Sequence, residues 1–177
     1  MMKRIDYFIP TRIVFGAGRL KELATLSLPG KKALLCVTED KLMEKLGIQQ
    51  RVIELLGQNG VSVAVFDKVT PNPTRTGVMA AAALAKESGC DFVIGLGGGS
   101  SIDTAKAASI MMANPGDLWD YVCGGTGKAQ PLLHPGLPIV TIATTSGTGS
   151  EINCWGVISN HETNEKIGFG DPSLNPV

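Results

Sequence analysis

The stretch that decides the fold reads Asp91-Phe-Val-Ile-Gly-Leu-Gly-Gly-Gly-Ser-Ser-Ile-Asp-Thr-Ala-Lys-Ala-Ala-Ser-Ile-Met-Met112. Its apolar run at 92–96 has the length and composition of a strand that is buried on both faces. Three glycines follow, and an alanine-rich helical pattern then begins at Ser100, the expected N-cap, with Asp103 at a capping-box position. Backbone N–H groups at such a helix start point at an anion, and glycine has no Cβ atom to keep a phosphate away. We therefore expect residues 97–100 to hold the pyrophosphate of a nucleotide.

A second interpretation of this stretch stays open. The sequence matches neither the G-x-G-x-x-G fingerprint nor the G-K-[ST] of a P-loop, so the three glycines could simply form a tight turn. Asp103 is equally open between a helix cap and a contact to the ligand.

Composition and charge limit the class of protein. The 177 residues suggest one domain, residues 1–177, and 16 basic residues balance 16 acidic ones. The balanced charge gives no reason to expect nucleic acid or an anionic membrane as a partner. No apolar run reaches the roughly 18 residues of a membrane span, and the first residues lack the apolar core of a signal peptide. Four widely spaced cysteines indicate reduced thiols in a cytoplasmic protein.

Strand and helix patterns alternate along most of the chain. Strands are expected at 33–37, 61–66, 92–96, 139–143 and 154–158, and helices at 19–26, 49–59, 74–87 with Thr74 as N-cap, 100–112 and 118–122. Two further short strands are expected at 7–9 and 12–15, and a polar turn at 159–165. The alternation predicts an α/β fold, a Rossmann-like parallel sheet flanked by helices, with irregular β additions.

Three polar clusters follow strands of this sheet, at 38–40, 97–100 and 144–148. Ligands of open parallel sheets lie beyond the carboxyl ends of the strands, so we expect the clusters to share one site. In the first cluster Glu39 is expected to bind the adenosine ribose hydroxyls and to repel a 2′-phosphate, which favours NAD over NADP. Asp40 is the alternative, although it suits the cap of the helix that follows. The hydroxyls and glycines of the third cluster are expected to form the second wall of the site.

The sequence lacks the common motifs of hydrolases and metalloenzymes. It contains no Ser-His-Asp elbow, no His-x-x-x-His and no recognisable pair of catalytic carboxylates. The two histidines, His134 and His161, are 27 positions apart in loop-like segments and are interpreted as surface residues. No residue pattern therefore predicts a metal site or an acid–base pair.

Three motifs resemble the iron-containing (group III) alcohol dehydrogenases. They are Gly97-Gly-Gly-Ser-Ser-Ile-Asp-Thr-Ala-Lys106, Pro71-Asn-Pro73 and Thr144-Thr-Ser-Gly-Thr-Gly-Ser-Glu151, in that family's order and spacing. The N-terminal segment at 7–18 is similar too, and residues 157–166 resemble the butanol dehydrogenase branch. The resemblance implies a domain that binds NAD or NADP, followed by a helical domain that carries Fe²⁺ as a Lewis acid for alcohol–aldehyde interconversion.

The resemblance also implies roles for individual residues. Gly98, Gly99 and Ser100 would meet the pyrophosphate, and Asp103 would lie near the nicotinamide. The remaining contacts would come from Asn72, Thr144, Thr145, Thr148, Val157 and Lys166. The family's metal ligands belong to the helical domain, which this sequence lacks, so we expect a chain truncated at its C-terminal end and inactive alone. A homodimer and a small alcohol or aldehyde as substrate are further expectations.

Two other functions stay open. One is a zinc-dependent relative on the same scaffold, such as glycerol dehydrogenase or dehydroquinate synthase, although the segment at 157–166 favours the butanol dehydrogenase branch. The other is a non-catalytic nucleotide-binding module.

Overall fold

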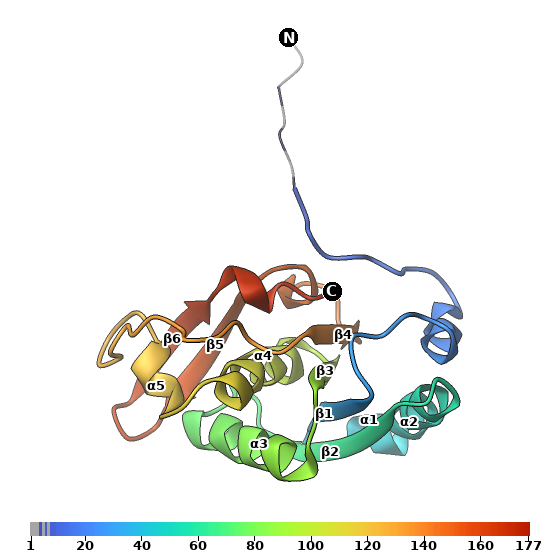
Figure 1. The fold of residues 1–177 in the computed structure, drawn as a ribbon, viewed down its shortest axis with the longest axis horizontal. Coiled ribbons are helices and arrows are strands. Elements are labelled where there is room, and N and C mark those ends of the chain that lie inside the picture. The colour runs from blue at the N-terminus through green and yellow to red at the C-terminus, as the bar shows by residue number, and fades with distance from the viewer. Residues whose placement is uncertain (1–3, 5, 7) are drawn as a thin grey trace.

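The computed structural model describes Arg4, Asp6 and residues 8–177. Its centre is a sheet of four parallel strands in the order β2-β1-β3-β4 (Figure 1). The strands are β1 (Lys32–Thr38), β2 (Ser62–Val69), β3 (Phe92–Gly97) and β4 (Ile139–Ala143). Because the chain adds β2 on one side of β1 and then β3 on the other, the connections diverge above the ends of β1 and β3. Open parallel sheets bind ligands at this kind of switch point.

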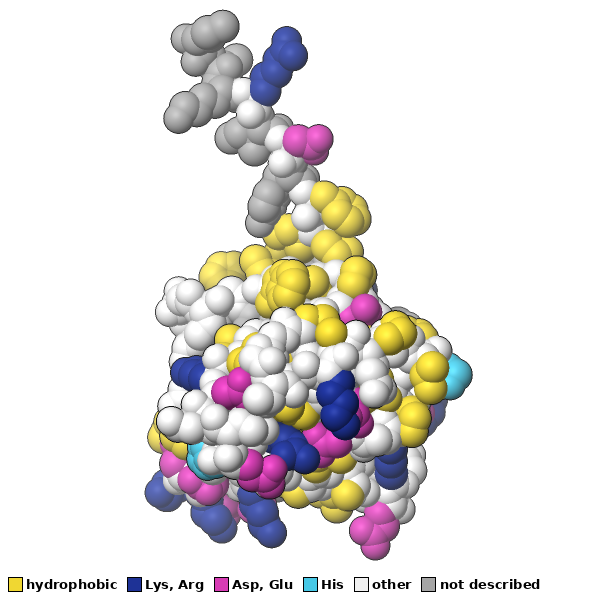
Figure 2. Space-filling model, turned by 90° about the vertical axis from the view of Figure 1, so that its left-hand side faces the viewer, with side chains coloured by type: hydrophobic (Ala, Val, Ile, Leu, Met, Phe, Trp, Pro, Cys, Tyr) yellow, Lys and Arg dark blue, Asp and Glu magenta, His cyan; other side chains and the backbone are white. Residues whose placement is uncertain are grey.

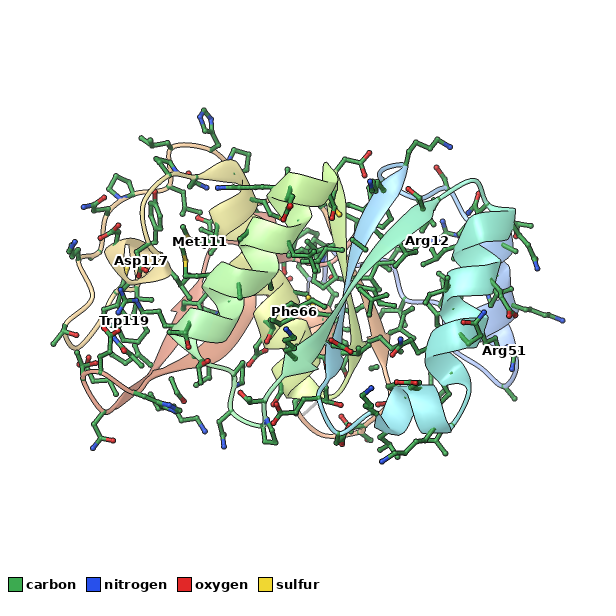
Figure 3. The ribbon with its side chains drawn as sticks, turned by 90° about the horizontal axis from the view of Figure 1, so that it is seen from below. Arg12, Arg51, Phe66, Met111, Asp117 and Trp119 are labelled. Carbon is green, nitrogen blue, oxygen red and sulfur yellow. The ribbon has the colours of Figure 1, made fainter. Side chains whose placement is uncertain are left out.

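Helices cover both faces of the sheet, which explains its apolar strands. In β1, Leu34 and Cys36 belong to one buried cluster, and Leu35 and Val37 belong to a second cluster on the opposite face. The first cluster packs under α3 (Arg75–Ser88) and α4 (Gly99–Ala113), and the second under α1 (Leu42–Lys45) and α2 (Ile48–Gln58). Figure 3 shows α3 and α2 on opposite sides of the strands. The structure confirms the expected parallel sheet flanked by helices.

The boundaries of α3 follow its capping signals closely. The Thr74 hydroxyl accepts a hydrogen bond from Gly77 N at 3.1 Å, as an N-cap should, and Gly89 ends α3 with a φ of 67°. Four shorter helical pieces complete the set: α5 (Leu118–Tyr121) and the 3₁₀ turns η1 (Arg19–Ala24), η2 (Ser150–Ile152) and η3 (Pro172–Leu174). In the part of the chain that the structure describes, no helix has the length and apolar composition for a membrane span.

An antiparallel hairpin of β5 (Trp155–Asn160) and β6 (Glu165–Gly170) forms a second, smaller sheet. The polar turn expected over 159–165 is shorter in the structure: it takes only residues 161–164, with Asn164 at a φ of 55°, and β6, which the sequence did not predict, begins directly after it. The hairpin packs beside α4 (Figure 1) and is tied to the loop before α3, where Ser159 N donates to Pro73 O at 2.8 Å.

The expected strands at the N-terminus are wrong where the structure describes them. Residues 12–15 form no strand, and neither do residues 8 and 9 of the first expected strand; Tyr7 lies outside the described residues. Phe8 is 84% exposed and Phe15 is 88% exposed. Hydrophobic side chains gather where this segment meets the body of the molecule (Figure 2). The β-prone residues form no strand here because a strand needs a neighbour to take its backbone hydrogen bonds.

Candidate functional site

The turn between β3 and α4 leaves the start of the helix open. Gly97 adopts a φ of 139°, a conformation that residues other than glycine rarely adopt, and Gly98 is the N-cap of α4. No side chain caps this helix. Ser100, expected as the N-cap, instead lies in the first turn, because the third glycine of the run already adopts helical geometry. The first N–H groups of α4 therefore face outward without a capping side chain, as an anion site requires.

The threonine-rich loop after β4 covers this glycine turn. A Cβ atom added to Gly98 would come within 3.2 Å of Thr145 Cγ2, and one added to Gly99 within 3.1 Å of Thr148 Cγ2. Thr144 N donates to Gly97 O at 3.0 Å, which extends the pairing of β4 and β3 beyond the strands. The structure thus brings together the two polar clusters expected to form opposite walls of one site.

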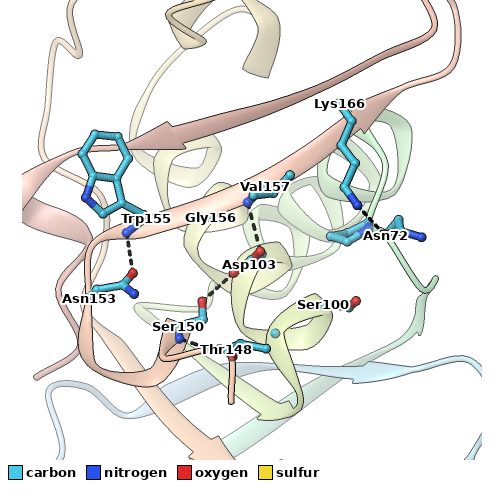
Figure 4. Close-up of a pocket in the computed structure, with 12 residues that line it drawn as sticks. Asn72, Ser100, Asp103, Thr148, Ser150, Asn153, Trp155, Gly156, Val157 and Lys166 are labelled. Carbon is cyan, nitrogen blue, oxygen red and sulfur yellow. Dashed lines mark hydrogen bonds between the residues drawn. The ribbon is translucent and has the colours of Figure 1, made fainter.

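A cavity of about 350 Å³ opens next to the helix start (Figure 4). Most of the residues predicted for the site contribute to its lining: Asn72, Gly99, Ser100, Asp103, Thr148, Val157 and Lys166. Gly98 and Thr145 lie together at the turn beside it, and Thr144 adjoins Gly97. The volume falls in the range of small-molecule sites.

Asp103 connects α4 to the hairpin at the bottom of the cavity. Its carboxylate accepts hydrogen bonds from Ser150 Oγ at 2.5 Å and from Val157 N at 2.9 Å (Figure 4). Burial raises the pKa of this carboxyl, and the two hydrogen bonds and nearby Lys106 oppose the rise. The expected capping box is wrong, since the side chain turns away from its own helix start towards β5.

Asn72 and Lys166 meet across the mouth of the cavity. Lys166 Nζ donates to Asn72 Oδ1 at 2.7 Å, joining β6 to the loop before α3 (Figure 4). Asn72 holds a φ of 56°, a left-handed conformation that asparagine tolerates better than most residues. An ammonium group and an amide from distant parts of the chain thus flank the same opening.

The sequence of this chain matches one known protein family over most of its length. A family model described as iron-containing alcohol dehydrogenase matches residues 10–177. The chain belongs to the iron-containing alcohol dehydrogenase family. This confirms the family to which the three motifs pointed.

Relatives within the iron-containing alcohol dehydrogenases share both sequence and fold. "Probable NADH-dependent butanol dehydrogenase 1" of Bacillus subtilis is 38% identical over 175 residues, which are 99% of this chain and 44% of that protein. A solved archaeal halo-thermophilic alcohol dehydrogenase from a Red Sea brine pool, bound to NZQ, has a TM-score of 0.89 at 34% identity. Sulfoacetaldehyde reductase from Bifidobacterium kashiwanohense, solved with NAD⁺, has a TM-score of 0.83 at 30% identity. Each match covers 99% of this chain but only 45% of the solved chain, so the chain spans less than half the length of these relatives.

Glu39 and Asp40 differ in their contacts in this iron-containing alcohol dehydrogenase fold, and Lys41, with a φ of 57°, takes the N-cap position of α1 that was expected for Asp40. Asp40 accepts hydrogen bonds from Leu42 N at 3.0 Å and Thr38 Oγ1 at 2.8 Å, which lower the pKa of its carboxyl and tie it to the start of α1. Glu39 follows β1 with an exposed side chain, outside the lining of the cavity. Its carboxylate is therefore the one left available for a ligand beyond the strand ends.

Sequence reasoning missed part of the cavity and one buried cation. Pro73, Ser150, Asn153, Trp155 and Gly156 also line the cavity. Ser150 belongs to the hydroxyl-rich run that follows β4, and the composition of that run is the sequence signal that could have identified it. Lys106 is fully buried, although a lysine in an alanine-rich helix usually faces solvent. Burial lowers the pKa of its ammonium to about 8, against the attraction of Asp103, Cys154 and Glu151.

The described residues offer no metal site. Among them, no three His, Cys, Asp or Glu side chains come together as ligands of an ion. An iron ion, which the family name implies, therefore does not fit the part of the chain seen here.

Proposed function

We propose that this chain binds NAD⁺ and NADH, and that it is the cofactor-binding half of a metal-dependent alcohol dehydrogenase. The enzyme would interconvert alcohols and aldehydes or ketones by hydride transfer. The observation that carries the proposal is the uncapped start of α4, which opens at the switch point of the parallel sheet beside the cavity. The relatives support it, since one is called NADH-dependent and another was solved with NAD⁺.

The residues around the glycine turn fit a diphosphate. The backbone N–H groups of Gly98, Gly99 and Ser100 would hold it, and the hydroxyls of Thr145 and Thr148 would donate from the facing loop. The Ser101 hydroxyl is buried against Gly97 and has no hydrogen-bond partner among the described residues, which is one more polar group next to the turn. Such a cradle neutralises the charge of the diphosphate mostly with backbone dipoles.

The inner part of the cavity would receive the nicotinamide end of the cofactor, which accepts or donates the hydride when bound. Val157 supplies an apolar edge, and Asp103 and Asn72 supply polar contacts. Thr144 would contribute to the ribose side, and Lys166 would bring positive charge to the mouth. A metal ion in the proposed enzyme would supply Lewis-acid stabilisation of the alcohol oxygen, and its ligands would have to come from outside the described residues, which bring no three ligand side chains together.

Glu39 is proposed to select NAD over NADP. A carboxylate beyond β1 can accept hydrogen bonds from both adenosine ribose hydroxyls, and it repels the 2′-phosphate of NADP. Titrating NADH and NADPH into the wild-type chain and Glu39→Gln tests this: NADH should bind more tightly to the wild type, and the variant should lose most of that preference. A wild type that prefers NADPH would overturn the assignment.

The main experiment places a side chain in the space proposed for the diphosphate. We expect Gly99→Val to weaken NADH binding by more than about tenfold, since the new side chain occupies space between the helix start and Thr148. Energy transfer from tryptophan to bound NADH is a suitable signal, because Trp155 lines the cavity. Gly57→Val is the matched control: it places the same side chain in α2, at an exposed position with nothing within 4 Å. Equal affinity for Gly99→Val and the control would refute the site.

The remaining expectations stay predictions, which rest on length and cysteine content for the first and third below and on the resemblance for the others. They are a single dinucleotide-binding domain over residues 1–177, a homodimer, a cytoplasmic location and a small alcohol or aldehyde as substrate. The relatives named for butanol and sulfoacetaldehyde support a small alcohol or aldehyde as the substrate class.

A further inference from the structure

One buried lysine holds a complete segment of the cavity wall. Lys106 Nζ, in the middle of α4, donates to Ser150 O and to Trp155 O at 2.7 Å each. It also lies 3.2 Å from Ser150 Oγ and 3.3 Å from Asn153 Oδ1. All four acceptors belong to residues 150–155, which run through η2 into the start of β5. The ammonium of Lys106 therefore holds residues 150–155 against α4.

The same segment shapes the cavity. Ser150, Asn153 and Trp155 line it, and Asn153 is fixed further by bonds to Gly149 O and from Trp155 N, each 2.8 Å. From Ser150 the hydrogen bonds continue to Asp103, and from Asp103 to the backbone of Val157. The buried ammonium thus stands at the inner end of a chain of hydrogen bonds that reaches the cavity lining.

We propose that Lys106 is a positioning residue of the cofactor site, whose charged ammonium fixes the 150–155 segment and directs the Ser150 hydroxyl to Asp103. The inference rests on the proposed binding of NADH and assigns Lys106 no contact with the cofactor.

The protonation state of Lys106 decides how these acceptors are satisfied. An ammonium has three N–H donors, enough for the two carbonyl oxygens and one shared between Ser150 Oγ and Asn153 Oδ1. A neutral amine has two donors and a lone pair, and the lone pair competes with Asp103 for the proton of the Ser150 hydroxyl. Losing the charge therefore weakens the bond that holds Asp103 in place.

The change of state falls within a range that experiments can reach. Burial lowers the pKa of Lys106 to about 8. The charged and titratable groups facing it are Asp103 on α4, Glu151 on η2 and Cys154 just before β5, and all three favour the ammonium. Cofactor affinity should accordingly fall as the pH rises through about 8.

The test is an NADH titration of the 177-residue chain between pH 7 and pH 9.5. The wild-type dissociation constant should rise by about tenfold across this range, as expected for one hydrogen bond to a charged group. Lys106→Met should bind about tenfold more weakly at pH 7, with a profile flatter than that of the wild type. Lys86→Met, which removes an exposed lysine from α3, should keep the wild-type affinity and profile.

A second variant keeps the test valid if Lys106→Met does not fold. Ser150→Ala leaves both carbonyl contacts of Lys106 but removes the hydroxyl, so binding should weaken and its pH dependence should flatten. Wild-type pH dependence that persists unchanged in the folded variants would overturn the positioning role. A wild type that binds no NADH at any pH would instead refute the proposed function.

Unfolding measured under the same conditions separates positioning from a purely structural role. Loss of the buried charge stabilises the folded chain, so stability should rise over the pH range in which affinity falls. If Lys106 were only structural, affinity would rise with stability or stay constant, and that result would also overturn the proposal.

Discussion

Raising the pH from 7 to 10.5 should stabilise this fold through one side chain, Lys106. The side chain is fully buried, and burial lowers the pKa of its ammonium from the ordinary 10.5 to about 8. Below pH 8 the ammonium is charged in both states, and the folded state carries the full cost of burying it. Between pH 8 and 10.5 the unfolded chain keeps the proton that the folded chain has released, so the free energy of unfolding increases with pH.

The lowered pKa corresponds to about 3 kcal/mol of unfolding free energy across this interval. Lys106→Met removes the titrating group and keeps a side chain of similar length. At pH 7 the variant avoids a buried charge but leaves the carbonyl oxygens of Ser150 and Trp155 without their donor, at about 1–3 kcal/mol each. The two effects oppose each other at pH 7, whereas only the wild type should gain the pH-dependent ~3 kcal/mol.

Urea unfolding at several pH values, followed by the fluorescence of buried Trp119, measures this difference. Burial also raises the pKa of the Cys36 thiol, which destabilises the folded state at high pH in both proteins and so cancels in the comparison. Lys86→Met should follow the wild type. Parallel stability curves for the wild type and Lys106→Met would refute the reasoning, because they would mean that the buried amine has an ordinary pKa.

Two further predictions concern the packing of the sheet and the helices. Gly95→Ala should lower the free energy of unfolding by about 1–3 kcal/mol, because its Cβ would lie 2.8 Å from the Cα of Ile102 and would push α4 away from β3. Gly57→Ala, in open space on α2, should instead raise it by about 1 kcal/mol in the same denaturation assay, and a loss of similar size in both variants would contradict the argument. Arg75→Ala should cost about 1 kcal/mol because it breaks the 2.7 Å pair with Asp117 together with the pair to the more exposed Glu162, whereas Glu162→Gln, which breaks only the second pair, should cost less. Equal losses in the two variants would show that the pair with Asp117 contributes nothing to stability.

Local signals were enough to predict the centre of this fold. The apolar run of β3 is buried at every position, and the glycines after it lead directly into α4, as the sequence indicated. Thr74 caps α3 because its hydroxyl and the helix start are neighbours in sequence. Such features depend on residues a few positions apart, so the chain encodes them without reference to the rest of the molecule.

Two of the errors concern features that depend on distant partners. Residues 12–15 have the β-branched and aromatic composition of a strand, but no neighbouring strand pairs with them among the described residues. β6 was missed for the opposite reason: Glu165–Gly170 is too mixed to indicate a strand alone, and it becomes one by pairing with β5. Propensity is a weak guide wherever pairing decides the outcome.

The site shows the same division. Residues 97–100 and 144–148 could be predicted because each cluster follows a strand whose end must lie at one edge of the sheet. The role of Lys106 could not be predicted, because the four oxygen atoms around its ammonium come from residues 150–155, more than forty positions away in the sequence. The expected Ser100 cap failed because three consecutive glycines leave the start of the helix uncertain by two positions.

The hairpin of β5 and β6 explains why the cavity lies on one side of the glycine turn. A parallel sheet with its helices provides only the floor of a site, made by strand ends and a helix N-terminus. The outer wall comes from the hairpin, which is held by Ser159 N to Pro73 O, by Lys166 to Asn72 and by Val157 N to Asp103. These three bonds join the hairpin to the loop before α3 and to α4, and two of them involve side chains that line the cavity. The hairpin is thus a sheet separate from the main one, and it closes the space in which the proposed cofactor would lie.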